Sequence, residues 1–291
     1  QDFDSLKAKA ATKEFAPVPL GVTASVALKN TLRTVDSRNV VAKLEGSDPV
    51  LKDEFVVYNA HWDYFGIGAK VNGDSIYNGA SDNATGVAGL LALARAYTAP
   101  KVPPKRSILF LSVTAEEQGL IGSQYYATNP LYPVAKTLAI INMDGLNSWG
   151  RTSDVVVMGY GASDLDDYAR VAAAEQGGRT LRPDAEPEKG YYYRSDHFNF
   201  AKVGVPAFYP GSGITFVGKD STYGLQKRAE YVANDYHKPS DDIKVAWDLS
   251  GAAEDVQFYF AIGYRVAMAA KWPEWKPGNE FRATREKSLR P

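Results

Sequence analysis

The stretch RSILFLSVTAEE, residues 106–117, indicates the kind of fold that this chain adopts. Its first part is a nearly continuous apolar run, as expected for a β-strand that is buried on both faces. It ends on two adjacent carboxylates, Glu116 and Glu117. Successive side chains of a strand point to opposite faces, so two neighbouring acids at a strand end do not easily share one task. Their roles depend on what stands at the ends of the other strands.

Comparable segments recur along the chain. Apolar runs predict further strands over residues 38–46, 54–61 and 137–144. The spacing of small and apolar residues elsewhere predicts helices over residues 84–98, 122–129, 163–176 and 251–270. Because strands and helices alternate, we expect one α/β domain with a largely parallel central sheet and helices on both of its faces.

The composition excludes several classes of function. The 291 residues contain no cysteine, which removes disulfides, thiolate nucleophiles and zinc sites built from cysteine. The formal net charge is −1 and no block rich in lysine and arginine occurs, so we expect no nucleic-acid partner. No apolar run reaches the roughly 18 to 20 residues that span a bilayer, so we expect no membrane span. The bulk numbers leave the oligomeric state open.

Polar side chains follow three of the predicted strands at the point where each strand ends. His61 and Asp63 end one strand, Glu116 and Glu117 end the second, and Asp144 ends the third. In open α/β sheets the functional site lies in the crevice beyond the carboxyl ends of the strands. The sequence therefore predicts that these side chains share one crevice.

Asp82 and the histidines extend this pattern. Asp82 precedes a predicted helix, where backbone N–H groups favour an anion, and a plain N-cap is its alternative role. The chain has only three histidines, His61, His197 and His237, and each lies in a polar stretch that contains carboxylates. This coincidence favours a metal site with nitrogen and oxygen ligands. The spacing of His61 and Asp63 also suits a carboxylate that accepts the second imidazole N–H.

Six stretches together resemble the M28 family of dizinc aminopeptidases, over about residues 38–270. They are AHWD (60–63), IYNGASDNATG (76–86), FLSVTAEEQGLIGS (110–123), INMDG (141–145), RSDHF (194–198) and YHKPSDD (236–242). The resemblance is to the secreted bacterial leucyl aminopeptidase type, in the same superfamily as glutamate carboxypeptidase. It implies a three-layer α/β/α sandwich with a mixed, mostly parallel central sheet, of the zinc-peptidase, phosphorylase/hydrolase-like kind.

Carried over position by position, the resemblance implies a site for two Zn²⁺ ions per chain. His61 and Asp144 would bind one ion, Glu117 and His237 the other, and Asp82 both. Glu116 matches the general base, Asp63 the carboxylate behind the first histidine, and Tyr236 the hydroxyl that meets the tetrahedral oxyanion. Arg194 matches a substrate-binding arginine of some members, whereas Ser195, Asp196 and His197 match supporting or structural positions.

The chemistry that this implies gives the two adjacent acids different roles. Two zinc ions roughly 3.5 to 4 Å apart lower the pKa of a bridging water and polarise the peptide carbonyl. With Glu117 as a ligand, Glu116 can take the proton of that water and pass it to the leaving amine. Asp82, Glu117, Asp144 and a bound hydroxide would balance the charge of the ions. We therefore expect a metallo-aminopeptidase that hydrolyses the N-terminal bond of peptides with a free N-terminus.

Several alternatives remain open at this point. A carboxypeptidase and a single-zinc glutaminyl cyclase occur on the same fold, and some relatives are non-catalytic. All five ligand positions and the base are present here, which disfavours a non-catalytic homologue. A serine hydrolase is disfavoured because the chain has no G-x-S-x-G stretch, and Ser195 and His197 lie only two residues apart.

The beginning of the chain gives further expectations. Residues 1–30 predict a short helix and a connector, and residues 31–291 the zinc peptidase catalytic domain. Residues 15–41 resemble the segment that follows a protease-associated insert in larger members, so we expect this chain to lack that insert. It begins at Gln1 without a methionine or a signal segment, which predicts a processed or trimmed product. The resemblance implies a periplasmic or secreted location.

Overall fold

The computed structural model describes residues 2–290, which divide after Asp36 into two compact units. In the first unit, helix α1 (Phe3–Ala10) begins after Asp2, whose carboxylate accepts a hydrogen bond from the backbone N–H of Ser5. Residues 15–36 then form no helix or strand. The domain boundary expected after residue 30 stays a prediction.

The second unit is built on a seven-stranded sheet with the strand order β1-β5-β2-β6-β9-β7-β8. Its strands are β1 (Val40–Leu44), β2 (Phe55–His61), β5 (Ser107–Val113), β6 (Thr137–Asn142), β7 (Asp154–Met158), β8 (Thr180–Pro183) and β9 (Ala207–Gly211). The central strands β5, β2, β6 and β9 run parallel, whereas β1 is antiparallel to β5 and β7 to β9. The predicted α/β fold with a mixed, mostly parallel sheet is confirmed.

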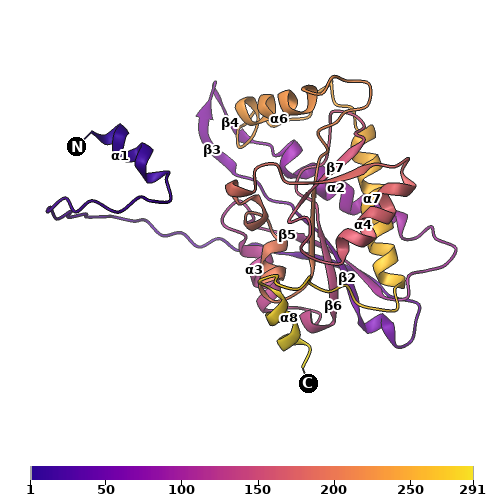
Figure 1. Ribbon diagram of the computed structural model, residues 1–291. Helices are drawn as coiled ribbons and strands as arrows, with labels where there is room; N and C mark the ends of the chain where they lie inside the picture. Colours follow the sequence, from indigo (N-terminus) through magenta and orange to yellow (C-terminus); the bar gives the residue numbers. More distant parts are fainter. Residues whose placement is uncertain (1, 291) are drawn as a thin grey trace. The chain divides into compact units, whose positions relative to one another are not determined.

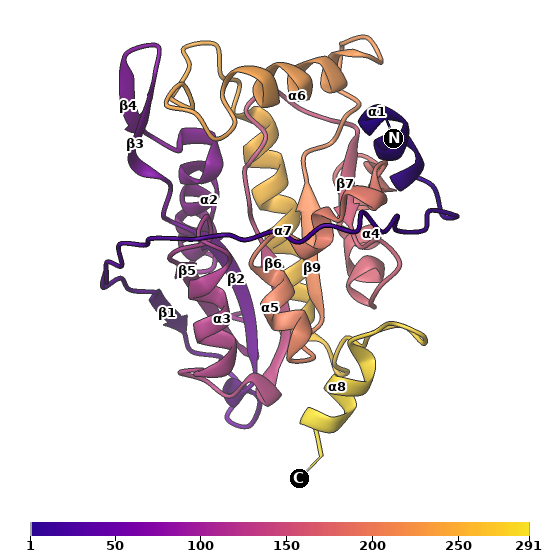
Figure 2. The same cartoon turned by 90° about the vertical axis from the view of Figure 1, so that its left-hand side faces the viewer.

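Helices cover both faces of this sheet (Figures 1 and 2). The helices of the unit are α2 (Thr85–Ala96), α3 (Ile121–Thr128), α4 (Leu165–Glu175), α5 (His197–Lys202), α6 (Tyr223–Asn234), α7 (Ser250–Met268) and α8 (Arg282–Ser288). Helices α2, α4 and α7 pack on one face, and α3 and α5 pack on the other.

Alternation along the strands explains the two layers of the core. In β2, the buried residues Val56 and Tyr58 belong to the apolar cluster that includes α2 and α7. Their neighbours Phe55 and Val57 belong to the opposite cluster, which contains Phe200 of α5. A strand with apolar residues on both faces is buried on both faces, as the continuous apolar runs predicted.

A separate two-stranded hairpin, β3 (Gly66–Val71) and β4 (Asp74–Tyr77), leaves the main sheet between His61 and Asp82. Both views place this hairpin and α6 at the same end of the unit (Figures 1 and 2). No helix within residues 2–290 combines the length and the apolar character needed to cross a membrane.

Candidate metal centre

The topology of the sheet brings the predicted site residues to one edge. Strands β5, β2 and β6 are adjacent and parallel, so their carboxyl ends lie side by side. His61 is the last residue of β2, Glu116 and Glu117 follow β5, and Asp144 follows β6. The fold therefore brings these strand ends together at the carboxyl edge of the sheet, where open α/β sheets place their sites.

Five side chains from these ends and two loops form two groups of potential ligands. In the first, His61 Nε2 lies 3.1 Å from Asp82 Oδ1 and 3.1 Å from Asp144 Oδ1. In the second, His237 Nε2 lies 3.3 Å from Glu117 Oε2 and 3.6 Å from Asp82 Oδ2. Within each group the ligand atoms lie within 4.8 Å of one another. Asp82 thus presents one carboxylate oxygen to each group.

The donor set fits divalent zinc. Two imidazole nitrogens and three carboxylates are ligands that zinc accepts, and no thiol is needed. Asp82 Oδ1 and Glu117 Oε1 are buried and accept no hydrogen bond from the described residues. Buried carboxylate oxygens without a donor are costly, and a cation at each group would remove that cost.

Crowding of carboxylates raises the pKa values of the two adjacent glutamates. Burial, together with the negative charge of Asp144, raises the pKa of Glu116 to about 10. Burial and the charge of Asp82 raise the pKa of Glu117 to about 7. At neutral pH without a cation, Glu116 therefore holds its proton and Glu117 is about half protonated. A divalent cation favours the ionised forms of both.

The histidines and Tyr236 respond to the same charges. Burial alone would lower the pKa of His61, but its contacts with Asp144 and Asp82 outweigh burial and hold that pKa well above the usual range. Burial would also lower the pKa of His237, but the contacts with Asp82 and Glu117 raise it above its usual value. Burial and the charge of Asp82 raise the pKa of Tyr236 to about 12, so its hydroxyl keeps its proton and can donate.

Asp63 contacts both His61 and Glu116. Its carbonyl oxygen lies 3.1 Å from His61 Nδ1, whereas its carboxylate oxygen Oδ1 lies 3.9 Å from that nitrogen. The same Oδ1 accepts a hydrogen bond from the backbone N–H of Glu116. The backbone carbonyl, rather than the expected carboxylate, is thus at hydrogen-bonding distance from the imidazole, and the carboxylate holds the segment that carries Glu116.

The stretch after Arg194 supports Asp144. The Ser195 hydroxyl donates to Asp144 Oδ2 at 2.6 Å and accepts a hydrogen bond from the amide of Asn142. Asp196 is buried and accepts a hydrogen bond from Asn59 on the neighbouring strand β2. Asp196 belongs to neither potential ligand group.

His197 is buried away from both ligand groups. Its ring centroid lies 4.7 Å from that of Tyr192 and 4.5 Å from that of Tyr209, and neither ring nitrogen has a hydrogen-bond partner among the described residues. Burial lowers the pKa of His197 from 6.5 to about 3. Below pH 6.5 the unfolded chain therefore protonates His197, whereas the folded protein keeps it neutral until the pH approaches 3.

Replacing His197 by phenylalanine should make the protein less sensitive to acid. A depressed folded pKa gives stability that is complete above the unfolded pKa and is lost as the pH falls towards the folded value. Between pH 7 and pH 5 the wild type should therefore lose roughly 2 kcal/mol of its free energy of unfolding through His197, and the variant should not. Urea unfolding at both pH values measures the difference. Tyr192→Phe, which removes no group titrating in this range, is the control and should lose stability with acid as the wild type does.

Two supporting residues were not identified from the sequence. The Asp241 carboxylate accepts hydrogen bonds from the backbone N–H groups of Ser81 and Asp82, both at 3.0 Å. The Asn83 amide oxygen accepts from Gly86 and Gly145, which ties the segment of Asp82 to that of Asp144. Asp241 lies in YHKPSDD, but the doublet alone does not indicate which aspartate points at Asp82.

Arg194 is not a member of either ligand group. Its side chain is exposed, and its guanidinium carbon lies 5.4 Å from the centroid of the Tyr191 ring. Its positive charge opposes the rise in the pKa of Tyr236 that burial and Asp82 cause, which places Arg194 in the electrostatic neighbourhood of that hydroxyl.

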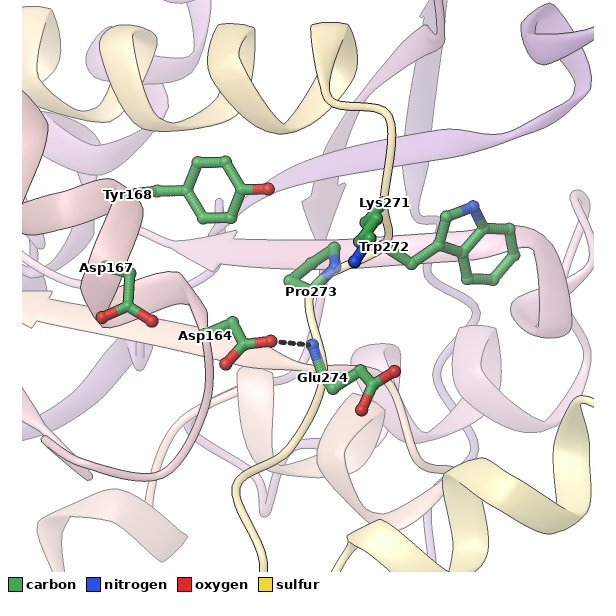
Figure 3. Close-up of a pocket in the computed structure, with 7 residues that line it drawn as sticks. All are labelled: Asp164, Asp167, Tyr168, Lys271, Trp272, Pro273 and Glu274. Carbon is green, nitrogen blue, oxygen red and sulfur yellow. Dashed lines mark hydrogen bonds between the residues drawn. The ribbon is translucent and has the colours of Figure 1, made fainter.

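A separate cavity, of about 710 Å³, is drawn with its lining residues in Figure 3. Its lining comes from the start of α4 and the segment after α7: Asp164, Asp167, Tyr168, Lys271, Trp272, Pro273 and Glu274. The Trp272 indole N–H donates to Glu54, which directly precedes β2, so this cavity lies near the amino ends of the central strands. It contains none of the ligand residues.

Relatives of known sequence or structure match different shares of the chain. A leupeptin-inactivating enzyme from Streptomyces exfoliatus is 30% identical over 185 residues, which are 63% of this chain and 36% of that protein. A vacuolar membrane protease from Colletotrichum graminicola is 33% identical over 96 residues, 33% of this chain and 8% of that protein. The structure of BSAP, a zinc aminopeptidase from Bacillus subtilis, superposes with a TM-score of 0.57 at 21% identity over 78% of this chain and 49% of that one.

The chain thus spans about a third of the Streptomyces relative and about half of the Bacillus structure. At 21% identity the Bacillus structure supports the fold. A family model matches residues 39–261, and this range includes the central sheet up to most of α7 and all five potential ligands. The chain therefore belongs to peptidase family M28.

Proposed function

We propose that this protein is a zinc-dependent aminopeptidase, which hydrolyses the N-terminal bond of peptides. The observation that carries this proposal is the pair of ligand groups that share Asp82 at the carboxyl edge of the sheet. Membership of a peptidase family supports hydrolysis of peptide bonds. The excess of carboxylates in the crevice supports recognition of a positively charged amino terminus.

The ligands divide into two sets that share one residue. His61 and Asp144 would hold one zinc ion, His237 and Glu117 the second, and Asp82 both. When bound, the ions would increase the acidity of a water molecule and polarise the peptide carbonyl.

The chain's own residues move the protons and position the reacting groups. Glu116 accepts the proton of the attacking water and delivers it to the leaving amine, because it lies beside the ligands without belonging to either group. The Tyr236 hydroxyl donates a hydrogen bond to the developing oxyanion. Asp63 fixes the backbone at Glu116 and the orientation of the His61 ring.

The proposed cellular location rests on the resemblance to secreted relatives. We propose the periplasm or the outside of the cell, as the resemblance to secreted bacterial aminopeptidases implies. The matching vacuolar membrane protease is named for a different location, so fractionation of the native host decides this point.

Metal content tests the assignment of ligands directly. Protein purified without chelators should contain about two zinc ions per chain, because two separate ligand groups are present. Elemental analysis of protein of known concentration gives this ratio. Asp82→Asn should lower it further than Asp144→Asn, since only Asp82 contributes to both groups.

A reproducible ratio of one zinc per chain with full activity would contradict this assignment. It would favour the single-zinc glutaminyl cyclase alternative. Glutaminyl peptides distinguish the two activities, because a cyclase forms a pyroglutamyl product while an aminopeptidase releases free glutamine.

A further inference from the structure

The ring of one tyrosine, Tyr191, contacts two arginine side chains. The guanidinium carbon of Arg194 lies 5.4 Å from the centroid of the Tyr191 ring, and that of Arg228 lies 5.2 Å from the same centroid. Arg194 follows the short turn Tyr191–Tyr193, whereas Arg228 belongs to α6. The ring therefore joins two cations from segments that are distant in sequence. Cation–π contacts of this kind hold a guanidinium in place while leaving its N–H groups available.

Arg194 adjoins the proposed catalytic site in the chain, and Arg228 shares the Tyr191 ring with Arg194. Arg194 directly precedes Ser195, whose hydroxyl donates to the ligand Asp144. Arg228 lies three residues before Tyr231 and thus on the same face of α6. The Tyr231 ring lies 5.9 Å from the ring of Tyr236.

The Tyr236 ring in turn stacks on that of His237 at a centroid distance of 3.7 Å. The rings of Tyr231, Tyr236 and His237 thus form a row of aromatic contacts that begins on the helix of Arg228.

Neither arginine has a carboxylate partner among residues 2–290 at ion-pair distance, although the chain offers acids nearby. Glu186 lies close enough to feel the charge of Arg228, but its carboxylate pairs with Lys189 at 2.6 Å. Glu230, two residues after Arg228, pairs with Lys227 at 2.7 Å. Two like charges on one ring repel each other, and an anion bound from outside would relieve that repulsion.

We propose that Arg194 and Arg228 form a carboxylate-binding subsite for the peptide substrate. Guanidinium groups bind carboxylates through paired N–H donors, and two of them held on one ring need little further ordering to do so. The carboxylate could belong to an acidic side chain or to the free C-terminus of a very short peptide. This subsite rests on the proposed aminopeptidase function and adds a substrate preference to it.

Two pairs of tripeptides separate the sources of the carboxylate. The first pair is Leu-Gly-Gly and its C-terminal amide, and the second is Leu-Glu-Gly-amide and Leu-Gln-Gly-amide. In at least one pair the wild type should hydrolyse the carboxylate-bearing peptide with a kcat/KM higher by on the order of 10-fold, mainly through a lower KM. The pair that shows the ratio identifies the source. Equal kcat/KM values within both pairs would overturn the proposal.

Variants assign the preference to the arginines. In the double variant Arg194→Gln, Arg228→Gln the ratio should fall to about one. Tyr191→Phe should keep it because the ring remains, whereas Tyr191→Ala should reduce it. Lys227→Gln removes one positive charge from the adjacent position of α6 and is the matched control, which should keep the ratio. A ratio that survives in the double variant contradicts the proposal.

A neutral reporter separates this inference from the proposed function. Leucyl-p-nitroanilide has no carboxylate, so its hydrolysis by the wild type reports the aminopeptidase activity independently of the subsite. Hydrolysis of this reporter without any preference among the tripeptides removes the subsite and leaves the aminopeptidase. Absence of hydrolysis for all these substrates with zinc bound removes both.

Discussion

Replacement of Glu116 by glutamine is expected to lower kcat by about 10²- to 10⁴-fold, the range typical of a lost general base. Glutamine keeps the shape of the side chain but cannot accept the proton of the attacking water. Zinc content should stay at the wild-type value, because Glu116 belongs to neither ligand group. The measurements are kcat on a leucyl peptide and elemental analysis of the same protein sample.

The adjacent residue provides the matched control. Glu117→Gln makes the same chemical change one position further along, but Glu117 Oε2 lies 3.3 Å from His237 Nε2 within a ligand group. This variant should lose zinc together with activity, and added zinc should restore part of the activity. If Glu116→Gln lost its zinc while Glu117→Gln kept it, the roles that we assign to the two glutamates would have to be exchanged.

The centre of the fold could be predicted because its strands are buried on both faces. Continuous apolar runs identified β2, β5 and β6, and long amphipathic spacing identified α2, α4 and α7. The hairpin β3–β4 was not predicted, because all of β3 is exposed and the alternation in its sequence GIGAKV is short and interrupted by glycine. Strands β7 to β9 are short, and the antiparallel direction of β7 depends on tertiary pairing that local patterns do not encode.

The candidate site could be predicted as a set of residue types but not as a geometry. Strand ends and the six sequence stretches identified five potential ligands, and the fold brings them into two groups. The contacts that position them depend on side-chain direction. Asp241 reaches the backbone of Asp82 from a loop more than 150 residues away, and Asp63 offers its carbonyl oxygen to His61. Arg228 gave no sequence signal because it belongs to none of the quoted stretches.

Acetylation of the substrate's amino terminus should nearly abolish cleavage, with a loss in kcat/KM of roughly 10⁴-fold, as is typical when a site built for a polar group meets an analogue lacking it. Four acidic side chains lie at the site. Asp82, Glu117 and Asp144 would bind zinc, which leaves the carboxylate of Glu116. A free α-ammonium can donate to the remaining carboxylate oxygens through charge-assisted hydrogen bonds. An acetylated nitrogen carries no charge and leaves those oxygens without a donor.

The direction of cleavage is decided by comparing three forms of one neutral hexapeptide: the free peptide, its N-acetyl form and its C-terminal amide. Removal of the C-terminal charge should matter little here, because five extended residues place that end about 16 Å from the scissile bond. The charge of Arg194 acts on Tyr236, and Arg194 shares the Tyr191 ring with Arg228, so the proposed subsite would reach a carboxylate only in shorter peptides or on a nearby side chain. A carboxypeptidase would reverse the result, since it needs a cation for the terminal carboxylate and tolerates a blocked amino end. If the acetylated hexapeptide is cut as well as the free one and the amide resists, the aminopeptidase assignment is wrong and the two arginines become the recognition site for the carboxyl terminus.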